Sequence, residues 1–167
     1  MNIGTYLKNL KMNIQLKFIA IHKSPECTVS INDQVKYQGP VQDIIDVAHT
    51  DTGPAQLSIA FTNKKPEDTV VDDTGKIIED KSFELDSITV DQYDLEELKW
   101  QSKYHCTDGQ TFDQCLFFGP PGKFVIDLEN PILPWILGTK HKLNDNDPNW
   151  QEDYNYYVQA CQLLQQI

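Results

Sequence analysis

Residues 13–21 read NIQLKFIAI, and this stretch indicates the fold class. Its first six positions alternate polar and apolar side chains, with Ile14, Leu16 and Phe18 as the apolar ones. A period of two places these three side chains on one face of a β-strand. We therefore predict a strand over Asn13–Ile21 with one face in a hydrophobic core.

Similar short runs follow at intervals of roughly 8–12 residues. Residues 27–39 (CTVSINDQVKYQG) place Asn32 and Asp33 between two alternating runs, which is typical of a hairpin turn. Residues 56–63 (QLSIAFTN) alternate after Gly53-Pro54. A later strand, Phe83 to Val90, shifts phase near Asp86-Ser87, which predicts a bulge. The pattern predicts an all-β fold, a jelly-roll-like β-sandwich with an N-terminal arm and one C-terminal α-helix.

Two proline-containing segments affect the end of the sandwich. Residues 120–122 (PPG) stand between two apolar runs and predict a tight hairpin turn. Residues 130–143 (NPILPWILGTKHKL) carry two prolines in an apolar run, so we expect an extended edge or a buried connection.

We divide the chain into an arm (1–11), the sandwich domain (12–143) and a helix (144–167). Asp147 suits the N-cap of this helix and Pro148 its first position. The helix either packs on its own sandwich or docks on another subunit. The candidate docking residues fall on one face at spacings of three and four: Trp150, Tyr154, Tyr157, Val158 and Leu164.

Composition narrows the classes of partner. The net charge of the 167 residues is −11, and the 14 basic residues are all lysine. Without arginine, and with a charge that repels phosphate, the chain is not expected to bind nucleic acid. The apolar runs are too short for a membrane span, so no membrane association is expected. The N-terminus does not resemble a signal peptide, so secretion by that route is not expected either.

The sequence carries no common enzyme motif, and we expect no catalytic activity and no catalytic residues. The sequence contains no Gly-x-Ser-x-Gly, His-Glu-x-x-His or phosphate-binding glycine loop. His105, Cys106 and Cys115 offer three zinc ligands without an evident fourth. We expect reduced thiols, while a bond between Cys106 and Cys115 across a hairpin stays open.

Residues 67–80 (EDTVVDDTGKIIED) hold six carboxylates around one glycine. In the register of an EF-hand with Gly75 as its glycine, three ligand positions carry Val70, Thr74 and Lys81, so that type of calcium loop is excluded. The β-branched runs on either side of DDTG instead predict an acidic hairpin. A calcium site of another type, built from several loops, stays open.

The order Phe61-Thr62-Asn63, then Asp68, then a strand with Asp86 and Asp91, resembles calcium-dependent carbohydrate-binding modules of the xylan-binding type. In that family an acid usually follows the asparagine at once, where this chain has two lysines. The resemblance implies a jelly roll that binds sugar diols through calcium. The residues it suggests as calcium ligands are Asn63, Asp68 and Asp91. The aromatic residues that would stack on sugar rings, or else pack in the core, are Trp100, Tyr104 and Trp135.

A second resemblance concerns residues 63–91 and 117–137, which look like segments of small jelly-roll proteins of tailed, marine bacteriophages. It implies a non-enzymatic component of the virion, on the capsid, tail or fibre, assembled in the host cytoplasm. Its partners would be other virion proteins or further copies in a symmetric assembly, with host glycans as an additional ligand. The alternatives are a stand-alone calcium-dependent carbohydrate-binding module and, third, a carbohydrate-active enzyme.

Overall fold

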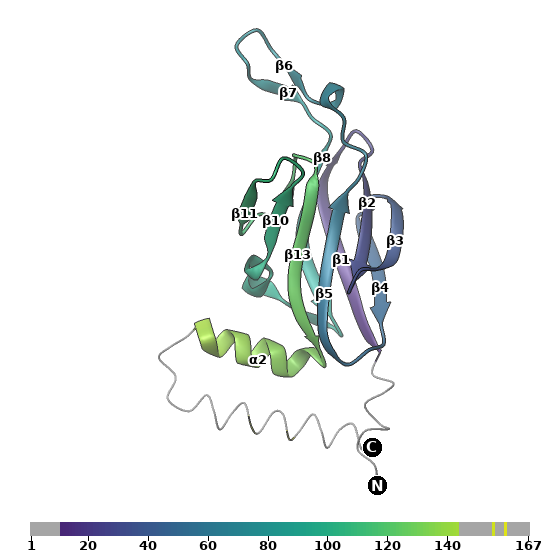
Figure 1. Ribbon diagram of the computed structural model, residues 1–167, viewed down its shortest axis with the longest axis vertical. Coiled ribbons are helices and arrows are strands. Elements are labelled where there is room, and N and C mark those ends of the chain that lie inside the picture. Colours follow the sequence, from purple (N-terminus) through teal and green to yellow (C-terminus); the bar gives the residue numbers. More distant parts are fainter. Residues whose placement is uncertain (1–10, 144–154, 156–158, 160–167) are drawn as a thin grey trace.

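The alternation in residues 13–21 corresponds to a strand whose side chains are buried and exposed in turn from Met12 to Phe18. The computed structural model describes residues 11–143 together with Asn155 and Gln159, and it is a two-layer β-sandwich (Figure 1). In chain order the elements are β1 (Met12–His22), β2 (Glu26–Ile31), β3 (Gln34–Pro40), β4 (Ile44–His49), β5 (Gly53–Phe61), η2 (Pro66–Asp68), β6 (Val70–Val71), β7 (Ile77–Glu79), β8 (Ser82–Val90), β9 (Tyr93–Asp94), η3 (Glu96–Gln101), β10 (Lys103–Cys106), β11 (Thr111–Asp113), β12 (Phe117–Phe118), β13 (Gly122–Asn130) and α2 (Ile132–Leu143).

The first sheet has the order β12-β8-β1-β4, with β9 paired to β8, and the second has the order β11-β10-β13-β5-β2-β3. Strand pairs in both sheets are antiparallel. The chain crosses between the sheets repeatedly, as in a jelly roll: β1 lies in the first, β2 and β3 in the second, β4 in the first and β5 in the second. The predicted all-β sandwich with a helix toward its C-terminal end is confirmed.

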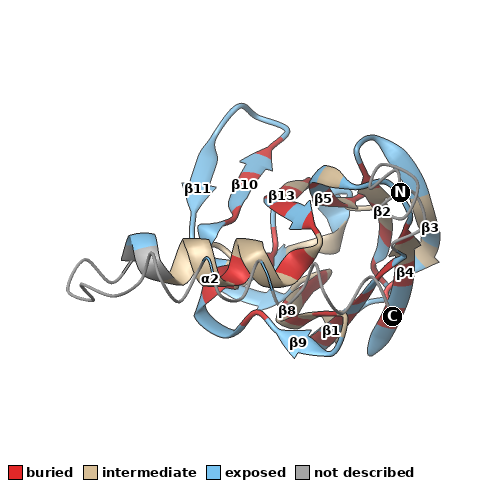
Figure 2. Ribbon diagram, turned by 90° about the horizontal axis from the view of Figure 1, so that it is seen from below, coloured by how far each residue is buried: buried red, intermediate tan, exposed pale blue. Residues whose placement is uncertain are grey.

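One apolar core lies between the sheets. Leu16 and Phe18 of the first sheet and Ile59 and Phe124 of the second are at most 1% exposed. Figure 2 shows buried residues on the strands of both sheets and on part of α2. Removal of this apolar surface from water is the main stabilising contribution to such a fold.

Two local predictions are confirmed. Asn32 and Asp33 have positive φ angles of 49° and 62° and connect β2 to β3, as in the two-residue hairpin turns that match strand twist. The pairing of β1 with β8 shifts between Lys17, which faces Ser87, and Phe18, which faces Leu85, so a bulge lies at the predicted position.

The acidic stretch forms the predicted hairpin, β6 with β7, which projects beyond the sandwich (Figure 1). Its turn is closed by Asp72, whose Oδ1 accepts hydrogen bonds from the backbone N–H groups of Thr74 (2.9 Å) and Lys76 (3.0 Å). Gly75 has a φ of 83°, which a side chain would oppose. These contacts fix the tip without a metal ion.

Of the two alternatives for residues 130–143, the extended edge was wrong, because Ile132–Leu143 form helix α2. Pro131 precedes the helix and Pro134 is its third residue. The first four N–H groups of a helix have no partner within it, so proline in this first turn removes no hydrogen bond. Ile132 and Ile136 are buried against the end of the sandwich.

The hairpin predicted at Pro120-Pro121-Gly122 was also wrong. This turn connects β12 in the first sheet to β13 in the second, so the flanking strands do not pair. A Cβ at Gly122 would lie 2.6 Å from the backbone oxygen of His105, so the glycine serves the close approach of β13 to β10.

The N-terminal arm (1–11), apart from Lys11, and the docking face on the C-terminal helix lie outside the described residues. The division of the chain into these three parts therefore stays a prediction. Among the described residues, no helix is long and apolar enough to cross a membrane.

Candidate binding site

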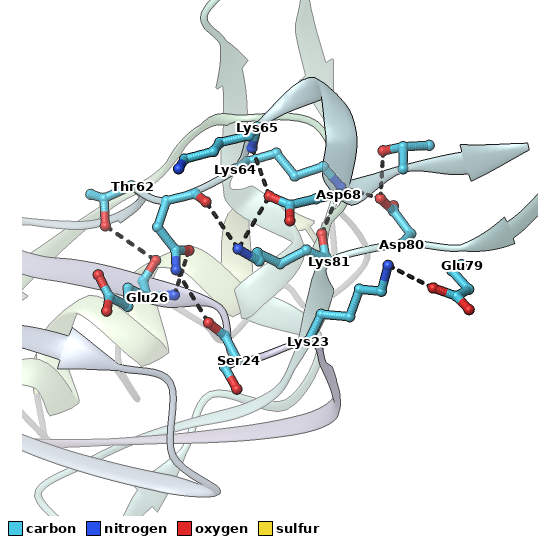
Figure 3. A network of polar contacts seen from close by, with 12 residues as sticks. Lys23, Ser24, Glu26, Thr62, Lys64, Lys65, Asp68, Glu79, Asp80 and Lys81 are labelled. Carbon is cyan, nitrogen blue, oxygen red and sulfur yellow. Dashed lines mark hydrogen bonds and ion pairs between the residues drawn. The ribbon is translucent and has the colours of Figure 1, made fainter.

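Lysines hold the base of the projecting hairpin (Figure 3). Lys23, in the turn after β1, pairs with Glu79 at 2.7 Å, and two less exposed lysines, Lys64 and Lys81, cross-link the two ends of the excursion. Lys64 Nζ pairs with Asp80 Oδ1 and donates to the backbone oxygen of Lys81 at 2.7 Å. Lys81 Nζ lies 3.1 Å from Asp68 Oδ2 and donates to the backbone oxygen of Asn63 at 3.3 Å. The side chains of the two lysines are only 7% and 14% exposed. Water therefore screens these pairs less than it screens ordinary surface pairs.

Asp68 is held in its charged form. The backbone N–H of Lys65 donates to its carboxylate at 2.8 Å. This hydrogen bond, together with the Lys81 ammonium, lowers the pKa of Asp68 below its ordinary value. The carboxylate is therefore ionised and already has its counter-charge.

The residues suggested as calcium ligands do not fit a calcium site in this structure. Asn63 Oδ1 accepts from the backbone N–H of Glu26 (2.8 Å), and Asp68 is bound to Lys81. Asp91 accepts from the backbone N–H of Asn13 (2.8 Å) and follows the opposite end of β8, about 30 Å of strand away. Among residues 11–143, no three His, Cys, Asp or Glu side chains gather so that they could hold a metal ion.

A groove of about 440 Å³ lies beside the hairpin base. The half-exposed ring of Phe117 lines it with Pro120, Pro121 and Ile77. Of its polar groups, Lys64 and Asp80 are already bound to each other. This groove is mainly apolar and offers few free hydrogen-bonding groups.

A second groove, of about 280 Å³, lies where α2 meets the outer face of the second sheet. Asp127 and Glu129 alternate with buried Leu128 along β13, so both carboxylates are exposed on this face. Gln56 on β5 stands opposite Asp127 and donates to its Oδ1 at 2.9 Å. Trp135, one turn into α2, completes the lining. We call these four residues, Gln56, Asp127, Glu129 and Trp135, the Trp135 groove.

The three aromatic residues suggested by the sequence have different surroundings. Tyr104 is fully buried, its ring meets Phe118 edge-on, and its hydroxyl donates to the backbone oxygen of Pro120 at 2.6 Å. Of the two alternatives considered for Tyr104, stacking on a sugar and packing in the core, its burial favours the second. Trp100 is 42% exposed on η3, and Trp135 is partly buried at its groove.

Of the residues singled out from the sequence, Trp135 lies at this groove; Gln56, Asp127 and Glu129, which also line it, were not singled out. A signal was present in residues 124–130 (FVIDLEN), where carboxylates at alternate positions predict one acidic strand face. What the sequence did not show is which neighbouring strand and helix would meet that face.

The three cysteines within the described residues do not pair with one another. Cys27, Cys106 and Cys115 are free, so the bond considered between the last two is not formed in this structure, while Cys161 lies outside the described residues. Burial raises the pKa of the Cys27 thiol to about 12, which makes it unreactive near neutral pH.

Comparisons with known proteins add a weak structural similarity. No protein-family model matches the chain, and no curated protein matches it. A solved carbohydrate-binding module, vCBM60 in its SeMet form, described as linking two calcium-dependent families by circular permutation, has a TM-score of 0.49 and 12% identity over 68% of this chain and 88% of its own. The same module in complex with galactobiose has a TM-score of 0.45 and 10% identity, over 71% of this chain and 99% of that one.

Proposed function

We propose that this protein is a non-enzymatic glycan-binding module that binds its ligand in the Trp135 groove. One observation carries the proposal: an indole borders a shallow groove together with an amide and two carboxylates. Sugars present both an apolar ring face and hydroxyl groups. An aromatic side chain matches the first, and planar polar side chains match the second.

Each residue would have a separate part in binding. The Trp135 indole would contact the ring face of a sugar, while Asp127 and Glu129 would accept hydrogen bonds from its hydroxyl groups. Gln56 already donates to Asp127 Oδ1 and so holds that carboxylate in place. Because the polar residues stand on paired strands, little conformational freedom would be lost on binding.

Catalysis is not part of this proposal. Glycosidases place two carboxyl groups on opposite sides of the bond that they cleave. Asp127 and Glu129 stand side by side on one face of one strand, so both approach a ligand from the same direction.

Isothermal titration with a panel of oligosaccharides tests the proposal. Trp135→Ala should weaken binding by about fivefold or more, since a stacked aromatic contributes on the order of 1 kcal/mol or more. Trp100→Ala, which removes an exposed indole outside the groove, is the matched control. Because Trp135 also contacts the core, Asp127→Ala provides a second variant, with thermal melts to verify that both fold. Binding that survives both groove variants would refute the assignment.

The role in a bacteriophage particle stays a prediction, as do the virion partners and location. The described residues carry no observation that bears on it. Its candidate docking residues, on the C-terminal helix, lie outside the described residues.

A further inference from the structure

The carboxylates of the Trp135 groove differ from those of the hairpin in their counter-charges. Asp68, Asp80 and Glu79 each pair with a lysine. In the described part of the chain, neither Asp127 nor Glu129 has a lysine or histidine nitrogen within 4 Å. The groove therefore presents two carboxylates that lack a cation.

Lys123 lies on the same strand as Asp127 and Glu129 but does not neutralise them. Its ammonium is directed toward Asp33, 3.9 Å away, in the β2–β3 turn. Asn32 in that turn, which also lines the groove, accepts from the backbone N–H of Gln56 and donates to the backbone oxygen of Pro54. The uncompensated charge at the groove is therefore negative.

We propose that the ligand of the Trp135 groove is an oligosaccharide with free amino groups, such as one built of glucosamine. The inference rests on the proposed glycan-binding function and names the class of sugar. A protonated amine is attracted both by an indole face and by carboxylates, and this groove offers both within one small volume. Uronic acids or sulfated sugars would instead meet like charge.

The chain's overall charge of −11 makes a general attraction for cations the main rival explanation. A matched pair of variants separates the two. Asp127→Asn with Glu129→Gln removes two charges at the groove. Asp113→Asn with Glu67→Gln removes two charges from exposed residues on β11 and η2, neither of which lines the groove.

The experiment is isothermal titration of the full chain with three tetrasaccharides. They are the tetramer of glucosamine, the tetramer of N-acetylglucosamine and the tetramer of galacturonic acid. We expect the glucosamine tetramer to bind about tenfold more tightly than the acetylated one, which keeps the ring and loses the charge. The groove variant should abolish this preference and the control variant should keep it. The preference should also shrink as salt is raised.

Each other outcome overturns the inference in a recognisable way. If the groove variant and the control variant lose the preference for the glucosamine tetramer equally, the attraction is to the net charge of the protein alone. Equal affinity for the free and acetylated tetramers, still dependent on Trp135, would refute the amino-sugar specificity and leave the proposed function standing. Failure of all three sugars and of the wider panel would refute both.

Discussion

At the scale of single residues, His49 is the buried titratable group with an unmatched atom. It is 1% exposed at the end of β4, and its Nε2 has no hydrogen-bond partner. Burial lowers the pKa of His49 below its ordinary value; nearby Lys36 acts in the same direction and Asp51 opposes it. The folded state therefore favours the neutral imidazole.

This environment predicts a pH dependence of stability. Below about pH 6.5 the unfolded chain binds a proton that the folded chain does not, so the free energy of unfolding falls as pH is lowered. The contribution of His49 is fully present above that pH, and its slope is at most about 1.4 kcal/mol per pH unit. Urea unfolding measures this. The free energy of unfolding should differ less between pH 7.5 and pH 5.5 in His49→Gln than in the unaltered chain.

The control for that prediction is His105→Gln, because it replaces a histidine that is exposed on β10, whereas His49 is buried. Other groups also change charge in this pH range. The test is therefore whether the free energy of unfolding depends less on pH in His49→Gln than in His105→Gln. An unchanged pH dependence in His49→Gln would mean that another group is responsible.

At the scale of elements, the hairpin depends on Lys64 and Lys81. Lys81→Met would leave the Asp68 carboxylate without its cation, and we expect it to lower the free energy of unfolding by more than the loss of an ordinary surface pair does. Lys17→Met is the matched control, because the Lys17–Asp86 pair is 53% and 39% exposed and should be worth under about 1 kcal/mol. Urea unfolding of the two variants measures both costs. Equal losses would mean that the hairpin base is no different from a surface pair.

The same contacts predict the response to calcium. Lys64 and Lys81 already supply positive charge to the carboxylates at the hairpin base. A divalent cation would have to displace an ammonium group from them. We therefore expect calcium to change the melting temperature of Asp68→Asn by the same amount as that of the unaltered chain, since a ligand that does not bind at the hairpin base gains nothing from Asp68. A rise with calcium that Asp68→Asn removes would contradict this.

At the scale of the whole molecule, both sheets share one core. Leu16 in the first sheet and Ile59 in the second are fully buried in the same cluster. We therefore expect a single cooperative transition, with tryptophan fluorescence and far-UV circular dichroism changing together. Leu16→Ala and Ile59→Ala should each lower the free energy of unfolding by about 2–5 kcal/mol. In each variant the midpoints measured by fluorescence and by circular dichroism should fall together. Separate midpoints for the two probes would show that the sheets unfold independently.

The sequence predicted what depends on local periodicity. Alternation located β1, and the Asn32-Asp33 and Asp72–Gly75 stretches located two hairpins, because turn geometry is decided by neighbouring residues. Pro134 misled the prediction for α2, since proline is unfavourable within a helix and acceptable in its first turn. The Trp135 groove joins β5, β13 and α2, and no periodicity within one segment specifies that meeting.

The hairpin between β5 and β8 has a consequence for how this sequence can change. The chain leaves the sandwich at Asn63 and returns at Lys81, and the lysines fasten the two ends of the excursion at its base. Residues beyond that fastening, from Val70 to Glu79, add no strand to either main sheet. Exposed excursions of this kind tolerate replacement and lengthening. The hairpin from Val70 to Glu79 is therefore a place where a new sequence can be inserted, by design or by evolution. The sandwich and its groove would stay the same.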